Sequence, residues 1–147
     1  MAMKFKGKDK LKIKLGRITK NTRASVKREL RRGGLLIEND AAESIIEQTP
    51  GGRPYPSRGR KGAIHWASPP GAAPNADTGE LHTSLTSVTT ESNDTIRTET
   101  GANTPYATAL ELGTAVMAPR PYMSPAFKKN TDRIKANVIR AVKRSQR

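Results

Sequence analysis

The chain has 147 residues, enough for one domain with a modest hydrophobic core, and its 27 basic and 13 acidic residues give a net charge of +14. The absence of cysteine excludes disulfides, thiolate nucleophiles and cysteine-based metal sites, and only two histidines are available for other metal or acid–base chemistry. No apolar run approaches the roughly 18 residues of a membrane span, so we expect no membrane partner.

The charge is unevenly distributed along the chain. Residues 1–32 carry 13 basic and 2 acidic groups, and residues 114–147 carry nine basic groups and one acidic group. Two internal stretches, 33–52 and 77–113, are net acidic. This distribution favours either a polyanionic partner or head-to-tail pairing, in which a basic surface of one copy meets an acidic surface of the next.

The first two predicted elements are a strand and a long helix. Alternating apolar residues and lysines predict a strand within 3–15, and apolar residues that recur every three or four positions predict a helix over 17–47. Gly33 and Gly34 interrupt this helical pattern and predict a kink or the close approach of another backbone. The helix is basic in its first half and acidic in its second, which opposes its dipole and indicates that partners determine these charges.

A segment rich in proline, glycine and arginine follows over residues 49–76, where the prolines exclude a helix. We expect a long arm or loop, either a disordered surface loop or a segment ordered by a partner, with a short strand at 63–67. The candidate contacts to DNA or to an acidic protein surface are Arg53, Arg58, Arg60 and Lys61 of this arm, together with Arg28, Arg31 and Arg32 of the preceding helix.

Short elements are predicted after the arm. Asp77 is the expected N-cap of a short helix that extends to Leu85, and Glu80 would complete a capping box. Two threonine-rich alternating stretches, 87–92 and 95–100, flank an Asn-Asp pair and predict a β-hairpin.

The C-terminal part of the chain is predicted to hold a short helix over 106–112 that ends at Gly113, an extended segment over 115–122, and a last helix from 126 to about 143. The order of elements predicts a single α+β domain over residues 1–147. In this domain a small antiparallel β-sheet is packed by a long N-terminal helix and a C-terminal helix.

Residues with catalytic potential do not form a known arrangement. No serine lies in a nucleophile-elbow motif, and His65 and His82 lack a metal-binding spacing. Glu111 is expected to cap a helix or to pair with Arg120. We therefore expect no enzyme, metal, cofactor or small-molecule substrate. No known nucleic-acid motif occurs either, so any DNA contact should involve phosphates and be independent of sequence.

Three local motifs carry a family resemblance. They are SPPGAAP at 68–74 leading into DTGELHTSL at 77–85, NTPYATALELGT at 103–114, and PRPYMSPAF at 119–127. In this order they resemble the neck and tail-completion protein family of long-tailed bacteriophages, the "gene product ten-like" family. That family pairs S-x-P-G…T-G-x-L-x-x-S with Y-A-x-x-x-E-x-G-T and P-x-P-F-[LM]-x-P-A. Leu112 stands where an aromatic residue is common, and Tyr122 where phenylalanine is common.

The resemblance implies a non-enzymatic virion protein that is assembled in the host cytoplasm. Such proteins form a ring, here expected to be a hexamer, at the head-proximal end of the tail, complete the tail and join it to the head. The implied partners are further copies of the chain, other phage neck and tail proteins, and packaged DNA in the bore. Two alternatives remain: a tail terminator that stops tube polymerisation, and a sequence-independent nucleic-acid-binding protein.

The residues expected at subunit or partner interfaces are Tyr106, Glu111, Gly113, Thr114, Arg120, Pro121, Tyr122 and Met123. The proline-bounded segment that contains the last four has a second interpretation. It can instead be a rigid connector that packs Tyr122, Met123 and Phe127 into the core of the subunit itself.

Overall fold

The structure, a computed structural model, describes residues 13–14 and 20–145. Its elements are β1 (Ile13–Lys14), α1 (Lys20–Ile46), β2 (Pro54–Pro56), β3 (Ile64–Trp66), α2 (Glu80–Thr83), β4 (Leu85–Glu91), β5 (Thr95–Ala102), α3 (Ala107–Leu112) and α4 (Met123–Ser145). The predicted α+β class is confirmed, with a long N-terminal helix and a C-terminal helix packed against small antiparallel sheets. Of the strand predicted over 3–15, β1 is described and the rest lies outside the described residues.

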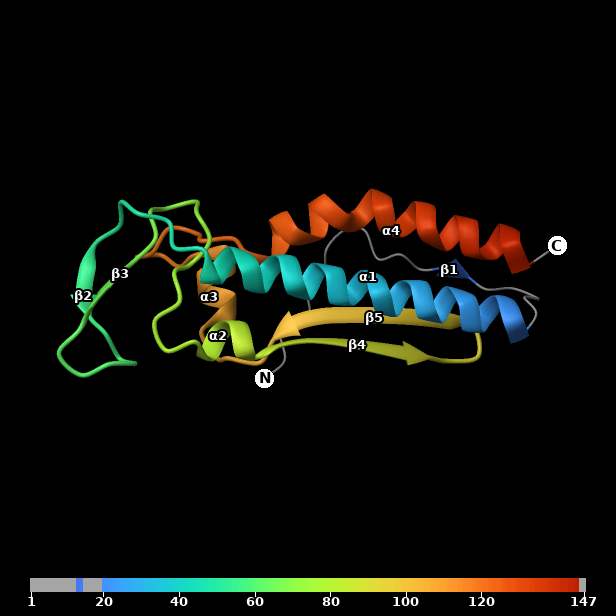
Figure 1. Ribbon diagram of the computed structural model, residues 1–147, viewed down its shortest axis with the longest axis horizontal. Helices are drawn as coiled ribbons and strands as arrows, with labels where there is room; N and C mark the ends of the chain where they lie inside the picture. Colours follow the sequence, from blue (N-terminus) through green and yellow to red (C-terminus); the bar gives the residue numbers. More distant parts are fainter. Residues whose placement is uncertain (1–12, 15–19, 146–147) are drawn as a thin grey trace.

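The two long helices form one layer of the molecule and the sheet lies against it. α1 and α4 lie side by side and run in opposite directions, and the β4–β5 hairpin packs along α1 (Figure 1). β5 pairs antiparallel with both β1 and β4. The predicted apolar stripe of α1 is buried between α4 and the sheet, and it consists of Val26, Leu30, Ile37, Ala41 and Ile45.

The glycine pair in α1 is the point of closest packing. A Cβ at Gly33 would lie 2.8 Å from Cγ1 of Ile134 in α4, and one at Gly34 would lie 2.1 Å from Oγ of Ser87 in β4. The helix continues through both glycines. Close packing is therefore observed at both glycines, but the atoms that approach belong to side chains and not to the backbone that the sequence analysis expected.

The predicted N-cap of the helix after the arm is wrong. α2 has only four residues and begins after Gly79, which is its N-cap residue and has a positive φ of 81° that favours glycine. The Asp77 carboxylate turns toward the arm and accepts hydrogen bonds there from the Ser57 hydroxyl and the Arg58 backbone N–H. The helix also ends before Leu85, which starts β4, because pairing with β5 takes up the residues from there onward.

The β-hairpin is confirmed and is longer than predicted, since β4 and β5 extend to Leu85 and Ala102. Gly113, with a φ of 75°, ends α3 as expected. The segment predicted to be extended over 115–122 instead contains a turn, in which the Thr114 N–H donates to the Met117 carbonyl at 2.8 Å.

Much of the expected loop at 49–76 is an ordered hairpin. β2 and β3 pair antiparallel at one end of the molecule, on the left in Figure 1, which confirms the short strand predicted at 63–67. The Asn75 side chain bonds Thr49 N–H and C=O at 2.8 and 3.0 Å and donates to the Trp66 carbonyl at 2.9 Å. Contacts within the chain therefore order this segment, which we call the arm (residues 49–76).

Candidate functional site

The three motifs that carry the family resemblance meet in space. The Gly71 N–H donates to the Pro119 carbonyl at 2.9 Å, and the Arg120 N–H donates to the Leu110 carbonyl at 2.7 Å. The guanidinium Nε of Arg120 donates to the Ser68 carbonyl at 3.1 Å. We call residues 68–74, 103–114 and 119–127 the motif junction.

Glu111 lies at the centre of the motif junction, 3% exposed. Its carboxylate accepts the backbone N–H groups of Tyr122, Met123 and Ser124 at 2.9, 3.0 and 2.9 Å. Pro125 follows and has no N–H, so this single carboxylate satisfies the donors that open α4. The negative charge also faces the positive end of the helix dipole.

The structure distinguishes between the two roles expected for Glu111, capping of a helix and pairing with Arg120. Capping is confirmed, although the helix that Glu111 caps is α4 and the residue itself belongs to α3. The expected pairing with Arg120 is wrong, because that guanidinium is directed to the Ser68 carbonyl. The cap also explains why α4 begins at Met123, three residues before the predicted start.

Tyr122 and Met123 were expected at an interface, but the structure places them in the core of the subunit, 1% and 3% exposed. Burial, and to a lesser degree the charge of Glu111, raises the pKa of Tyr122 far above its usual value. The rigid-connector interpretation therefore holds for these two side chains. Phe127, the third in that interpretation, is 36% exposed and is only partly covered.

Exposed apolar side chains lie at and beside the motif junction, and the sequence reasoning missed them. Leu112 is 65% exposed and Val116, in the turn after α3, is 98% exposed. Of the expected interface residues, Thr114 is exposed beside them, and Tyr106 is 38% exposed and donates to a Glu80 carboxylate oxygen at 3.3 Å. The usable signal was Gly113, which ends α3 directly after Leu112 and precedes the tight turn that contains Val116.

The remaining expected interface residues are less accessible. Gly113 is half-buried, and a Cβ there would lie 2.8 Å from the Met117 carbonyl. Pro121 is also half-buried beside the core. These two residues, like Glu111, shape the surface without presenting side chains on it.

The predicted cations fall into two separate groups. Arg53, Arg58, Arg60 and Lys61 are exposed on the arm, and none of them forms an ion pair with a described residue. Arg28, Arg31 and Arg32 are exposed on α1, where Arg28 and Arg32 approach Glu29 at 3.8 and 3.1 Å.

Further cations join the α1 group from α4. A shallow groove of about 370 Å³ between the two helices is lined by Arg32 and Arg133, and an adjoining hollow of about 230 Å³ by Arg32, Arg140 and Arg144. Glu29 lines both, so the arginines exceed the acidic residues but do not stand alone. The sequence reasoning missed this set. The sequence nevertheless indicates it, because Arg133, Arg140 and Arg144 are separated by seven and four residues on α4, which places them on one face of the helix.

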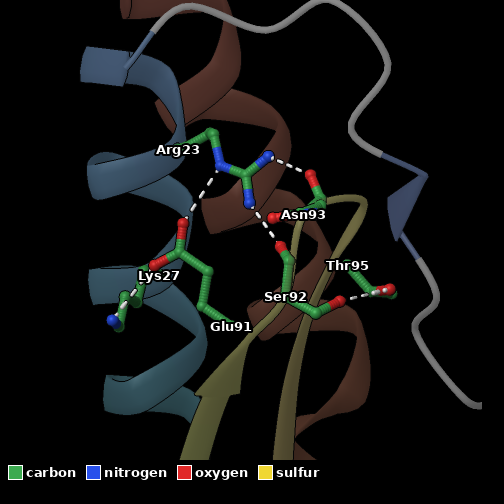
Figure 2. A network of polar contacts seen from close by, with 6 residues as sticks. All are labelled: Arg23, Lys27, Glu91, Ser92, Asn93 and Thr95. Atoms are coloured by element: carbon green, nitrogen blue, oxygen red, sulfur yellow. Dashed lines mark hydrogen bonds and ion pairs between the residues drawn. The ribbon is translucent and has the colours of Figure 1, made fainter.

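A polar network at the other end of the molecule fixes the β4–β5 turn to α1 (Figure 2). The Arg23 guanidinium donates to Glu91 at 3.0 Å and to the carbonyls of Ser92 and Asn93, each at 2.6 Å. Lys27 donates to the second Glu91 oxygen at 3.1 Å. The hydrogen bonds from Lys27 and then Arg23 lower the pKa of Glu91.

Within the described residues, no group of three or more histidine, aspartate or glutamate side chains is placed to hold a metal ion. None of the described helices has the length and apolar character needed to cross a membrane. The structure thus defines an α+β protein with two long antiparallel helices over a small sheet. No family model, curated protein or solved structure matches the chain.

Proposed function

We propose that the protein is a structural component of a bacteriophage neck. In this role it forms a ring, six copies in our proposal, at the head-proximal end of the tail, completes the tail and joins it to the head. We propose no enzymatic activity, cofactor or small-molecule substrate, and we place the protein in the virion after assembly in the host cytoplasm.

The motif junction is the observation that supports this proposal. Three motifs that resemble those of the neck and tail-completion family are separated in sequence, and direct hydrogen bonds join them around Glu111. Their convergence fits motifs that serve one structural role. The motifs together form one hydrogen-bonded structural unit, and the exposed side chains of Leu112 and Val116 lie at its edge.

The charge distribution agrees with a ring in a DNA-filled neck. Closed rings need heterologous interfaces, in which one surface of a copy meets a different surface of the next. The chain offers separate basic and acidic surfaces for such contacts. A basic groove between α1 and α4 also suits sequence-independent contact with phosphates in a bore.

The test is removal of the gene from the phage that carries it, with complementation from a plasmid. We expect DNA-filled heads and separate tails of normal length in electron micrographs. Tails of excessive length would favour the tail-terminator alternative. Normal virions without the protein would contradict the proposal.

The nucleic-acid alternative needs a second measurement. Fluorescence anisotropy with labelled duplex DNA measures binding by the purified protein across a salt series. Tight binding by a protein that is absent from purified virions would favour a nucleic-acid-binding protein over a neck component.

A further inference from the structure

The arm presents an apolar face to solvent. Pro54 lies opposite Trp66 and Pro56 opposite Ile64 in the β2–β3 register. Alternate residues of a strand point to the same side of a sheet, so these four side chains share one face. All four are exposed, with Ile64 at 67% and Trp66 at 55%. We call Pro54, Pro56, Ile64 and Trp66 the arm face.

The opposite side of the hairpin faces the body of the protein. Tyr55 and His65 are paired there, with ring centroids 4.9 Å apart, and His65 is buried with its Nδ1 3.8 Å from Asp77. Because Asp77 also binds Ser57 and Arg58 next to β2, the hairpin is held in one position. A fixed arm binds a partner with little loss of conformational entropy.

The surroundings of the arm face indicate the chemistry of its partner. Four exposed cations, Arg53, Arg58, Arg60 and Lys61, precede β2 or lie between β2 and β3 in the sequence, and none of them forms an ion pair with a described residue. An apolar centre with a charged rim is the usual anatomy of a protein interface, and tryptophan and arginine are enriched among the residues that dominate binding. The partner surface should therefore be apolar at its centre and acidic around it.

The last turns of α1 carry such a surface. Glu43 and Glu47 are exposed and form no ion pair with a described residue, and Ile46 between them is 56% exposed. Carboxylates near the C-terminus of a helix are unfavourable to the helix itself, because they face the negative end of its dipole. A cationic partner would remove this cost. We call Glu43, Ile46 and Glu47 the acidic patch.

We infer that the arm face of one copy docks on the acidic patch of a second copy. The apolar side chains of the arm cover Ile46, and the cations at its rim pair with Glu43 and Glu47. The two surfaces differ, so the contact is heterologous and propagates around a ring. This inference rests on the proposed function, which it deepens by naming the contact between neighbouring copies.

Mixed cysteine crosslinking tests the pairing directly, because the chain has no native cysteine. Full-length Ile64→Cys and Ile46→Cys variants carry tags of different size and are mixed with a short bismaleimide. We expect a covalent heterodimer from the mixture and little product from either variant alone. The matched control pairs Ile64→Cys with Val88→Cys, which is 55% exposed on the sheet. Absence of the heterodimer, or equal yield with the control, would overturn the inference.

A charge exchange tests the proposed ion pairs. We would make two double variants, one with Glu43→Lys and Glu47→Lys and the other with Arg60→Glu and Lys61→Glu. Each should weaken self-association in sedimentation by about tenfold, because each removes two exposed ion pairs and adds repulsion. Combining all four changes should restore it to within about threefold of the wild type. Asp94→Lys with Asp132→Lys is the control, and circular dichroism checks folding. Equal loss in the control, or no recovery in the combination, would contradict the pairing.

Three further outcomes separate the inference from its alternatives. If the mixture gives no heterodimer and added duplex DNA quenches Trp66, the single tryptophan, the arm binds nucleic acid and the inference fails. If virions contain the ring but the cysteine pair does not crosslink, the inference fails and the proposed function stands. If the heterodimer forms but virions lack the protein, the proposed function fails.

Discussion

The carboxylate of Glu111 in α3 accepts the backbone N–H of Met123, the first residue of α4, at 3.0 Å. Two more N–H groups share the same carboxylate. One side chain therefore fixes where α4 starts and holds its N-terminus against α3. Since α4 is a main partner of α1, this contact links the motif junction to the helical layer.

Glu111→Gln should destabilise the protein by about 1–2 kcal/mol, and Glu111→Ala by more. The amide keeps one acceptor but brings an NH₂ group against backbone donors, and alanine leaves all three donors without this partner. Urea unfolding of both variants measures the difference. Glu99→Gln, a substitution at a half-exposed carboxylate on β5, is the control and should change stability little. Unchanged stability in Glu111→Ala would contradict the capping role.

Gly34→Ala should cost about 1–3 kcal/mol, although alanine favours helices by about 1 kcal/mol over glycine. The new Cβ would lie 2.1 Å from Ser87 Oγ and 2.5 Å from Thr98 Cγ2, so these two side chains, or the strands that carry them, must shift away from α1. Adding Ser87→Ala should recover part of the loss in urea unfolding. Gly33→Ala, which meets only the Ile134 side chain, should cost less. Equal effects at the two glycines would argue against sheet contact as the cause.

Stability should fall in acid. Hydrogen bonds lower the folded-state pKa values of three carboxyl groups: Asp40 (mainly through Asn130), Asp77 (mainly through Ser57) and Glu91 (mainly through Lys27). The ordinary pKa is 3.8 for aspartate and 4.5 for glutamate. A carboxyl group with a lowered folded-state pKa contributes its full stability above that ordinary pKa. This stability is lost as the pH falls through the folded-state pKa.

Thermal unfolding from about pH 6 to about pH 2 measures this loss as a decreasing Tm. Asp77→Asn should lower the Tm at pH 6 and flatten its decrease in acid, because its carboxylate no longer gains from the Ser57 and Arg58 donors. Asp94→Asn changes an exposed carboxylate in the β4–β5 turn and should leave the curve unchanged. A Tm that stays constant into acid would exclude these contacts as contributors.

If the protein has the proposed role in a phage neck, reversal of Arg28, Arg31 and Arg32 to glutamate should reduce the joining of tails to heads and make it more sensitive to salt. These arginines are exposed beside the basic groove, and in the proposed role their summed charge would attract DNA or an acidic neighbour. Infectious titre and free tails in a complementation assay measure the effect. The triple lysine variant keeps the charge and should retain most activity. An unchanged titre after reversal would remove this face from the functional account.

Local patterns in the sequence determined much of the secondary structure. The apolar spacing of α1, the turn between β4 and β5, and Gly113 at the end of α3 act through neighbouring residues, so propensity and periodicity were enough. The arm was predicted only in part. Its composition excluded a helix, but its order depends on Asp77 and Asn75, which are outside the β2–β3 pairing.

Tertiary contacts decided the features that distant residues create. Aspartate is a common N-cap residue, but hydrogen-bond donors in the arm bind the Asp77 carboxylate, and α2 begins after Gly79 instead. Glu111 caps a helix that starts 12 residues after it, which no local pattern encodes. Burial of Tyr122 and exposure of Trp66 likewise depend on which elements come to lie over them. The sequence by itself determined the elements and their charges, whereas packing determined which side chains remain available to a partner, because accessibility is a property of the assembled fold.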